Sequence, residues 1–140
     1  MSEMLRAGIV RIFRESDQQV VGVGFLVDAE KKTILTCAHV LNAAIDQPDN
    51  KDKPRALIGI DFPFLAAGQR LDARATAFFP KTANTSDDVA VLEVLDALPA
   101  QAKAVRLVVS ESFSGDEFGV YGFPRGFEES GQYVEGMIQE

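Results

Sequence analysis

Residues 34–41 read Ile-Leu-Thr-Cys-Ala-His-Val-Leu, an apolar run that contains His39, the only histidine of the chain. Residues 33–36 are β-branched or apolar, which predicts a strand. Residues 38–44 predict one short helical turn after it, so that His39 lies at the strand end and faces out of the sheet. A lone histidine beside apolar residues is more often a packed or surface residue than a catalyst. The role of His39 therefore depends on the segments around it.

Short β-branched and apolar runs recur along the chain between clusters of turn-forming residues. This pattern favours an all-β sandwich or barrel over alternating strands and helices. The six strands expected before residue 100 are residues 7–14, 20–27, 33–36, 55–60, 73–79 and 89–94. A segment with proline, alanine and charge then interrupts the pattern, and two further strands are expected at residues 115–124 and 132–139.

The composition fits one folded domain of 140 residues, because 46% of them are hydrophobic. The longest apolar stretches are far shorter than the roughly 20 residues that a membrane-spanning helix needs. Residues 1–6 lack the basic start and long apolar segment of a secretion signal. We therefore expect no membrane association.

The charge balance argues against nucleic-acid binding, because the net charge is −7 and the cations are not clustered. The single cysteine, Cys37, excludes an internal disulfide and fits a reducing compartment, so we expect a cytoplasmic location. No second cysteine or histidine cluster accompanies it, so no zinc site or other cofactor is expected. Cys37 is instead expected to be a small buried hydrophobe.

Two carboxylates, Asp87 and Asp88, precede the apolar run Val-Ala-Val-Leu at residues 89–92. An imidazole that acts as a base needs a carboxylate to fix its tautomer, and His39 is the only candidate base. Adjacent strand residues point to opposite faces, so only one of the two acids can face the ring. The alternative interpretation of the pair is a simple turn before a strand.

Three segments occur in a fixed order: Val-Gly-Val-Gly-Phe-Leu-Val at residues 21–27, the His39 segment, and Ser-Asp-Asp-Val-Ala-Val-Leu at residues 86–92. In this order they resemble the trypsin-like (chymotrypsin-fold) serine peptidases of bacterial type. The resemblance implies a chymotrypsin-like antiparallel β-barrel, with His39 as general base and Asp88 as the acid that orients it. In that family the acid directly precedes the aliphatic run, which is the position of Asp88 and not of Asp87.

The two glycines of the first segment, Gly22 and Gly24, also begin a Gly-x-Gly pattern, but the third glycine of a dinucleotide-binding loop is missing. The resemblance implies instead that they let neighbouring backbone approach closely. The sequence Gly-Phe-Pro-Arg-Gly at residues 122–126 resembles the turn that opens the second barrel of these peptidases.

The nucleophile of the family lies in a Gly-x-Ser-Gly segment, which these 140 residues do not contain. Ser114 and Ser130 are each followed by glycine but lack the earlier one, and Ser110 and Ser112 have neither. We therefore expect a complete first barrel, a connection, and only the opening hairpin of a truncated second barrel. The corresponding ranges are 1–100, 101–114 and 115–140.

Two functions remain open from the sequence. The first is a serine endopeptidase domain that ends before its nucleophile and is inactive as this chain. The second is a non-catalytic trypsin-like barrel that binds a protein or peptide, for example by strand addition. Further expectations are a peptide substrate, fusion to other domains, and self-association through the unpaired strands of the C-terminal hairpin.

Overall fold

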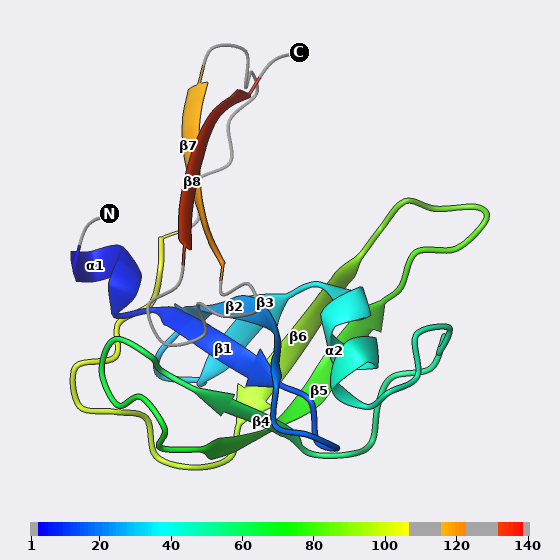
Figure 1. Ribbon diagram of the computed structural model, residues 1–140, viewed down its shortest axis with the longest axis horizontal. Coiled ribbons are helices and arrows are strands. Elements are labelled where there is room, and N and C mark those ends of the chain that lie inside the picture. Colours follow the sequence, from blue (N-terminus) through cyan, green and yellow to red (C-terminus); the bar gives the residue numbers. More distant parts are fainter. Residues whose placement is uncertain (1–2, 107–115, 123–131, 139–140) are drawn as a thin grey trace.

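The computed structural model describes residues 3–106, 116–122 and 132–138 (Figure 1). Two short helices and eight strands occur there. In chain order they are α1 (Glu3–Arg6), β1 (Ile9–Phe13), β2 (Val20–Asp28), β3 (Thr33–Thr36), α2 (Ala38–Ala44), β4 (Ile58–Asp61), β5 (Leu71–Phe79), β6 (Val89–Val94), β7 (Asp116–Gly122) and β8 (Gln132–Ile138).

The first six strands form a closed barrel in the order β1-β2-β3-β6-β5-β4. The barrel closes because β1 pairs with β2 on one side and with β4 on the other. All six pairings are antiparallel. The predicted all-β class and the six-stranded barrel are therefore confirmed.

The predicted strands agree with the observed ones to within a few residues, and two of them, β3 and β6, have the predicted bounds. The largest difference is β4, which begins at Ile58 rather than at residue 55. Arg55 and Ala56 are exposed, and the chain enters the ladder where the buried Ile58 pairs with Ala73 of β5. Helix α1 was not expected from the sequence.

The core fills the barrel interior with alternate side chains of the strands, as a half-buried strand requires. Helix α2 packs against β1, β2 and β6 and buries its apolar side against the same core. The core residues are Val10, Ile12, Leu26, Ile34, Ala38, Val40, Leu41, Ala44, Ile58, Ile60, Phe62, Leu71, Ala73, Ala75, Ala90, Leu92 and Val94. The helix is therefore fixed by packing, although it has only seven residues.

One ion pair is buried at the edge of this core. Arg11 of β1 donates to both carboxylate oxygens of Asp61 of β4, at 2.9 and 2.5 Å. Asp61 is fully buried, and it also accepts a hydrogen bond from the backbone N–H of Gly68 at 2.8 Å. The pair thus joins β1 to β4, where the barrel closes.

The two strands expected after residue 110 occur as β7 and β8, which form a separate antiparallel sheet that extends away from the barrel in Figure 1. Before it, the chain runs along the barrel, where Lys103 N–H bonds the carbonyl of Ala7 and Val105 N–H bonds that of Leu26. Most of the predicted turn at 122–126 and the four late serines, Ser110, Ser112, Ser114 and Ser130, lie outside the described residues. In the described part of the chain, no helix has the length and apolar character needed to cross a membrane.

Candidate active site

His39 is the second residue of α2, directly after β3. The β3–β6 ladder decides which acid it meets. Thr36, the last residue of β3, pairs with Ala90 of β6. Continuing this antiparallel register by two residues brings the start of α2 beside Asp88, which directly precedes β6. Residues 49 positions apart in sequence are therefore neighbours at one end of the barrel.

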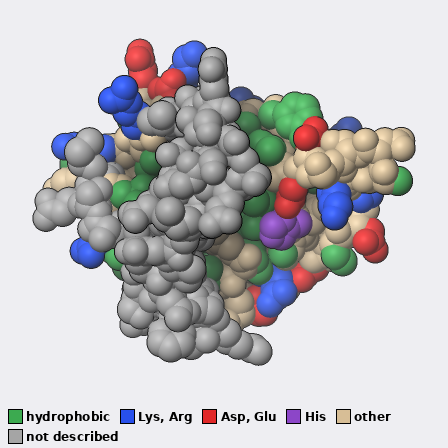
Figure 2. All heavy atoms as spheres, turned by 90° about the horizontal axis from the view of Figure 1, so that it is seen from above, with side chains coloured by type: hydrophobic (Ala, Val, Ile, Leu, Met, Phe, Trp, Pro, Cys, Tyr) green, Lys and Arg blue, Asp and Glu red, His purple; other side chains and the backbone are tan. Residues whose placement is uncertain are grey.

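Asp88 contacts His39 twice. One carboxylate oxygen, Oδ2, bonds the ring Nδ1, and the other, Oδ1, accepts a hydrogen bond from the His39 backbone N–H at 2.9 Å. A carboxylate only accepts hydrogen bonds, so Nδ1 must carry the ring proton. In the neutral ring, Nε2 then has a free lone pair. The His39 side chain is 71% exposed, and in Figure 2 it forms the purple surface patch with acidic red spheres beside it.

The same carboxylate completes the start of α2. The first N–H groups of a helix have no partner within the helix. The N-cap residue, Cys37, makes no side-chain capping bond, and the N–H of His39 is bonded by Asp88 instead. A negative charge at this position is also favoured by the helix dipole. Asp88 therefore fixes both the backbone and the ring of His39.

The pKa of Asp88 lies below its ordinary value. Burial is the largest single contribution and raises it, but several contributions oppose burial and together prevail. These are the hydrogen bonds from the His39 ring and backbone, the charge of His39, and the backbone N–H of Ala38. Asp88 is consequently held as a carboxylate near neutral pH.

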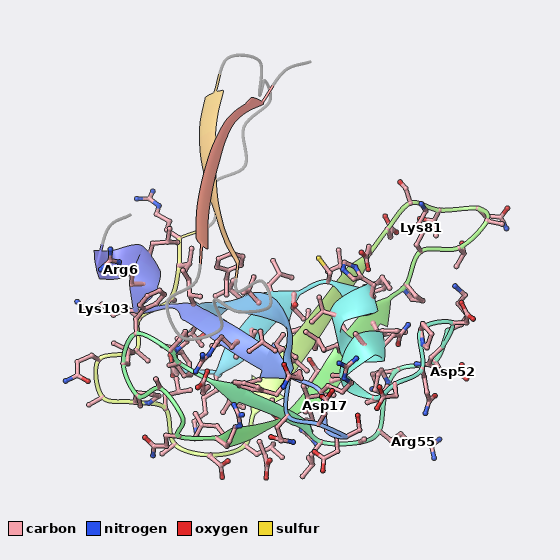
Figure 3. The ribbon with its side chains drawn as sticks, in the orientation of Figure 1. Arg6, Asp17, Asp52, Arg55, Lys81 and Lys103 are labelled. Atoms are coloured by element: carbon pink, nitrogen blue, oxygen red, sulfur yellow. The ribbon has the colours of Figure 1, made fainter. Side chains whose placement is uncertain are left out.

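Asp87, the neighbouring acid, makes no hydrogen bond or ion pair with the imidazole, which is bonded by Asp88. It is exposed, and its backbone N–H bonds the hydroxyl of Thr85 at 3.1 Å. The loop between β5 and β6 is held from outside by Lys51, whose ammonium bonds the carbonyl of Lys81 at 2.9 Å. Figure 3 labels Lys81 on this loop, which projects beyond the barrel beside α2. The loop thus delivers Asp88, not Asp87, to His39.

Both glycines of the segment at residues 21–27 lie where a larger side chain would collide. A Cβ at Gly22 would lie 2.6 Å from both methyl groups of Val40, and one at Gly24 would lie 2.7 Å from a methyl group of Ile34. The prediction that these glycines allow close approach is confirmed. Gly22 in particular sets how closely α2, and with it His39, approaches β2.

Cys37 is exposed, so the expectation of a buried small hydrophobe was wrong. Ile34 and Thr36 point into the barrel, so period-two alternation places Leu35 and Cys37 on the other side. Partial burial of the thiol, and then the charge of Asp88, raise the pKa of Cys37. One donor atom each of Cys37, His39 and Asp88 lies within 4.8 Å of the others, which makes this group a candidate metal site.

The chain is similar to known proteins in sequence and in fold. The sequence matches the profile of the trypsin-like peptidase domain over residues 22–140. The chain belongs to the trypsin-like peptidase family. The match begins at Gly22 and includes His39 and Asp88. A search of curated proteins found no match.

Solved structures of trypsin-like peptidases share the fold. Kallikrein-related peptidase 10 is 18% identical, with a TM-score of 0.61 over 96% of this chain and 58% of that one. The HtrA-type protease AlgW with decapeptide is 17% identical, with a TM-score of 0.62 over 97% and 43%. A third structure, that of GrC, is 20% identical, with a TM-score of 0.65 over 100% and 63%. This chain therefore spans less than two thirds of each of these structures.

Proposed function

We propose that this chain supplies the general base and the orienting acid of a serine endopeptidase. The observation that carries the proposal is the double contact of Asp88 with His39, which leaves Nε2 of an exposed imidazole free to accept a proton. In peptide hydrolysis Nε2 takes the proton of the attacking hydroxyl, and Asp88 stabilises the imidazolium that forms. The ring then returns the proton to the leaving amine.

In this proposal the nucleophile is encoded downstream of Glu140, and the 140-residue chain alone does not hydrolyse peptides. Two observations support it: the sequence contains no Gly-x-Ser-Gly, and the chain spans between 43% and 63% of three trypsin-like structures. Residues 1–100 would then form the first barrel, 101–114 the connection, and 115–140 the opening hairpin of the second barrel. Further fused domains are compatible with this arrangement.

The proposed substrate is a peptide or protein segment. The similar structure of the HtrA-type protease AlgW is one with a decapeptide, which supports a peptide ligand for this fold. We also propose a reducing, cytoplasmic compartment, because Cys37, the only cysteine, is exposed and can form no disulfide within the chain.

A second candidate is a non-catalytic barrel that binds peptides. The capping bond from the His39 backbone to Asp88 gives this candidate a structural reason for Asp88, because that bond stabilises α2 without any catalysis. Under this candidate Asp88 only stabilises the start of α2, and the imidazole takes part in no reaction.

A fluorophosphonate probe distinguishes the two candidates, because it labels only a serine activated by a base. We expect no labelling of the 140-residue chain, labelling of a longer product of the same gene, and loss of that labelling with His39→Ala. Asp87→Asn is the matched control and should keep the labelling, since the imidazole is bonded by Asp88 and not by Asp87. Absence of labelling from every longer product, together with saturable peptide binding, would support the binding module instead.

A further inference from the structure

The fold brings Asp88 to Cys37 and His39, so that three side chains able to bind a metal lie together. Cys37 and His39 flank the start of α2, and Asp88 joins them from the end of the β5–β6 loop. One donor atom of each lies within 4.8 Å of the other two. The sequence indicated no zinc site because it lacks a second cysteine or histidine cluster, but the barrel supplies a carboxylate as the third donor.

We propose that Cys37, His39 and Asp88 form a binding site for Zn²⁺ that inhibits the base. A thiolate, an imidazole nitrogen and a carboxylate oxygen are all zinc ligands, and three protein ligands leave a fourth position for water. The thiolate selects a thiophilic ion over Mg²⁺ or Ca²⁺, which prefer oxygen donors. Binding converts the Cys37 thiol to a thiolate and releases its proton to solvent.

The exposure of the three residues makes coordination feasible. Cys37 is exposed, the His39 side chain is 71% exposed and that of Asp88 is 32% exposed. The thiol and the ring can therefore rotate toward an ion from solvent without opening the barrel core. Coordination through Nδ1 requires the ring bond to Asp88 to lengthen and the ring proton to move from Nδ1 to Nε2, whereas the backbone bond from His39 to Asp88 can remain.

Inhibition follows because the ion would occupy the same imidazole and carboxylate that the proposed mechanism uses. This consequence rests on the proposed function, but binding of the ion does not. The two are separated by measuring binding on the 140-residue chain, which needs no nucleophile, and inhibition on a longer product that reacts with the fluorophosphonate probe.

The binding experiment uses Co²⁺ as a spectroscopic probe and Zn²⁺ in titration calorimetry. We expect a thiolate-to-cobalt charge-transfer band and one Zn²⁺ per chain. Cys37→Ser should remove the band and weaken Zn²⁺ binding at least about tenfold. Cys37 makes no side-chain capping bond, so this variant should keep α2, which circular dichroism and the unfolding midpoint verify.

Asp87→Asn is the control for general attraction of cations to an acidic chain. It removes a carboxylate adjacent to the site but no ligand, so it should leave the band and the affinity unchanged. The proposal is overturned if the wild-type chain gives no thiolate band, or if Cys37→Ser binds Zn²⁺ as tightly as wild type. An equal loss of affinity in Asp87→Asn would also overturn it, because the ion would then be held by the surface acids.

Discussion

The backbone of Gly22 in β2 packs directly against Val40 in α2, and a Cβ at Gly22 would lie 2.6 Å from both Val40 methyl groups. Val40 is 6% exposed and follows His39, so it has little room to move. We expect Gly22→Ala to displace α2 and to lower the free energy of unfolding by about 1–3 kcal/mol. Urea denaturation measures the loss, and the chemical shifts of His39 report the displacement.

Gly59→Ala is the matched control, because a Cβ at this strand glycine would meet nothing within 4 Å. It should change stability far less than Gly22→Ala. Val40→Ala creates space at the contact, so the double variant Gly22→Ala/Val40→Ala should be more stable than the sum of the two single losses predicts. Additive losses would show that the Gly22–Val40 contact does not position the helix.

His39→Ala should raise the pKa of Asp88, because it removes the ring hydrogen bond and the His39 charge that lower it. In the wild-type chain the pKa of Asp88 is lower when folded than when unfolded. The bond to His39 therefore stabilises the fold at pH values above the Asp88 pKa of the unfolded chain. This stabilisation is lost as the pH falls through the Asp88 pKa of the folded chain. Carbon NMR titration of the carboxyl group measures the pKa directly.

Asp87→Asn provides the comparison for this titration, since Asp87 lies beside Asp88 but does not bond the ring. The Asp88 pKa should remain low in it. An unchanged Asp88 pKa in His39→Ala would mean that the backbone N–H groups of α2 alone hold the carboxylate. That result would remove the ring contact as an argument for catalysis.

Asp61→Asn should destabilise the barrel by about 3–5 kcal/mol, because it leaves the buried guanidinium of Arg11 without its carboxylate. The exposed pair of Arg74 and Glu93 is the control, with side chains 60% and 39% exposed. Glu93→Gln should cost less than about 1 kcal/mol. Denaturant unfolding of the two variants compares these losses, and similar small losses would show that the buried pair does not hold β1 to β4.

The strands could be predicted because each depends on a short local pattern, whereas the choice of Asp88 as the partner of His39 came from the resemblance to trypsin-like peptidases. Alternating apolar runs predict β3 and β6, and their ladder then brings Asp88 to His39. A second contact between distant segments could not be predicted. The buried Asp61 pairs with Arg11 across 50 residues, and nothing near either residue in sequence indicates that contact. The exposure of Cys37 was predictable from strand alternation but was obscured by its apolar neighbours.

Cys37 should react with a thiol reagent in the folded chain, because it is exposed. Burial and the Asp88 charge raise its pKa, so it should react more slowly near neutral pH than in the unfolded chain, where more thiolate forms. Asp88→Asn removes the charge and should speed the folded reaction severalfold, whereas Asp87→Asn should not. Equal rates in all three folded chains would show that Asp88 does not act on the thiol.

The hairpin of β7 and β8 is expected to make the chain self-associate. The two strands pair along their whole length with each other, and among the described residues neither pairs with a barrel strand, so each has one edge with no ladder partner there. A two-stranded sheet is marginally stable alone, and pairing with a second copy would extend it.

Sedimentation velocity should show a concentration-dependent dimer. Val120→Pro removes a backbone donor from β7 and should shift the equilibrium toward monomer, whereas Gly59→Ala in the barrel should not. A monomer at all concentrations, with the hairpin resistant to proteolysis, would contradict this prediction.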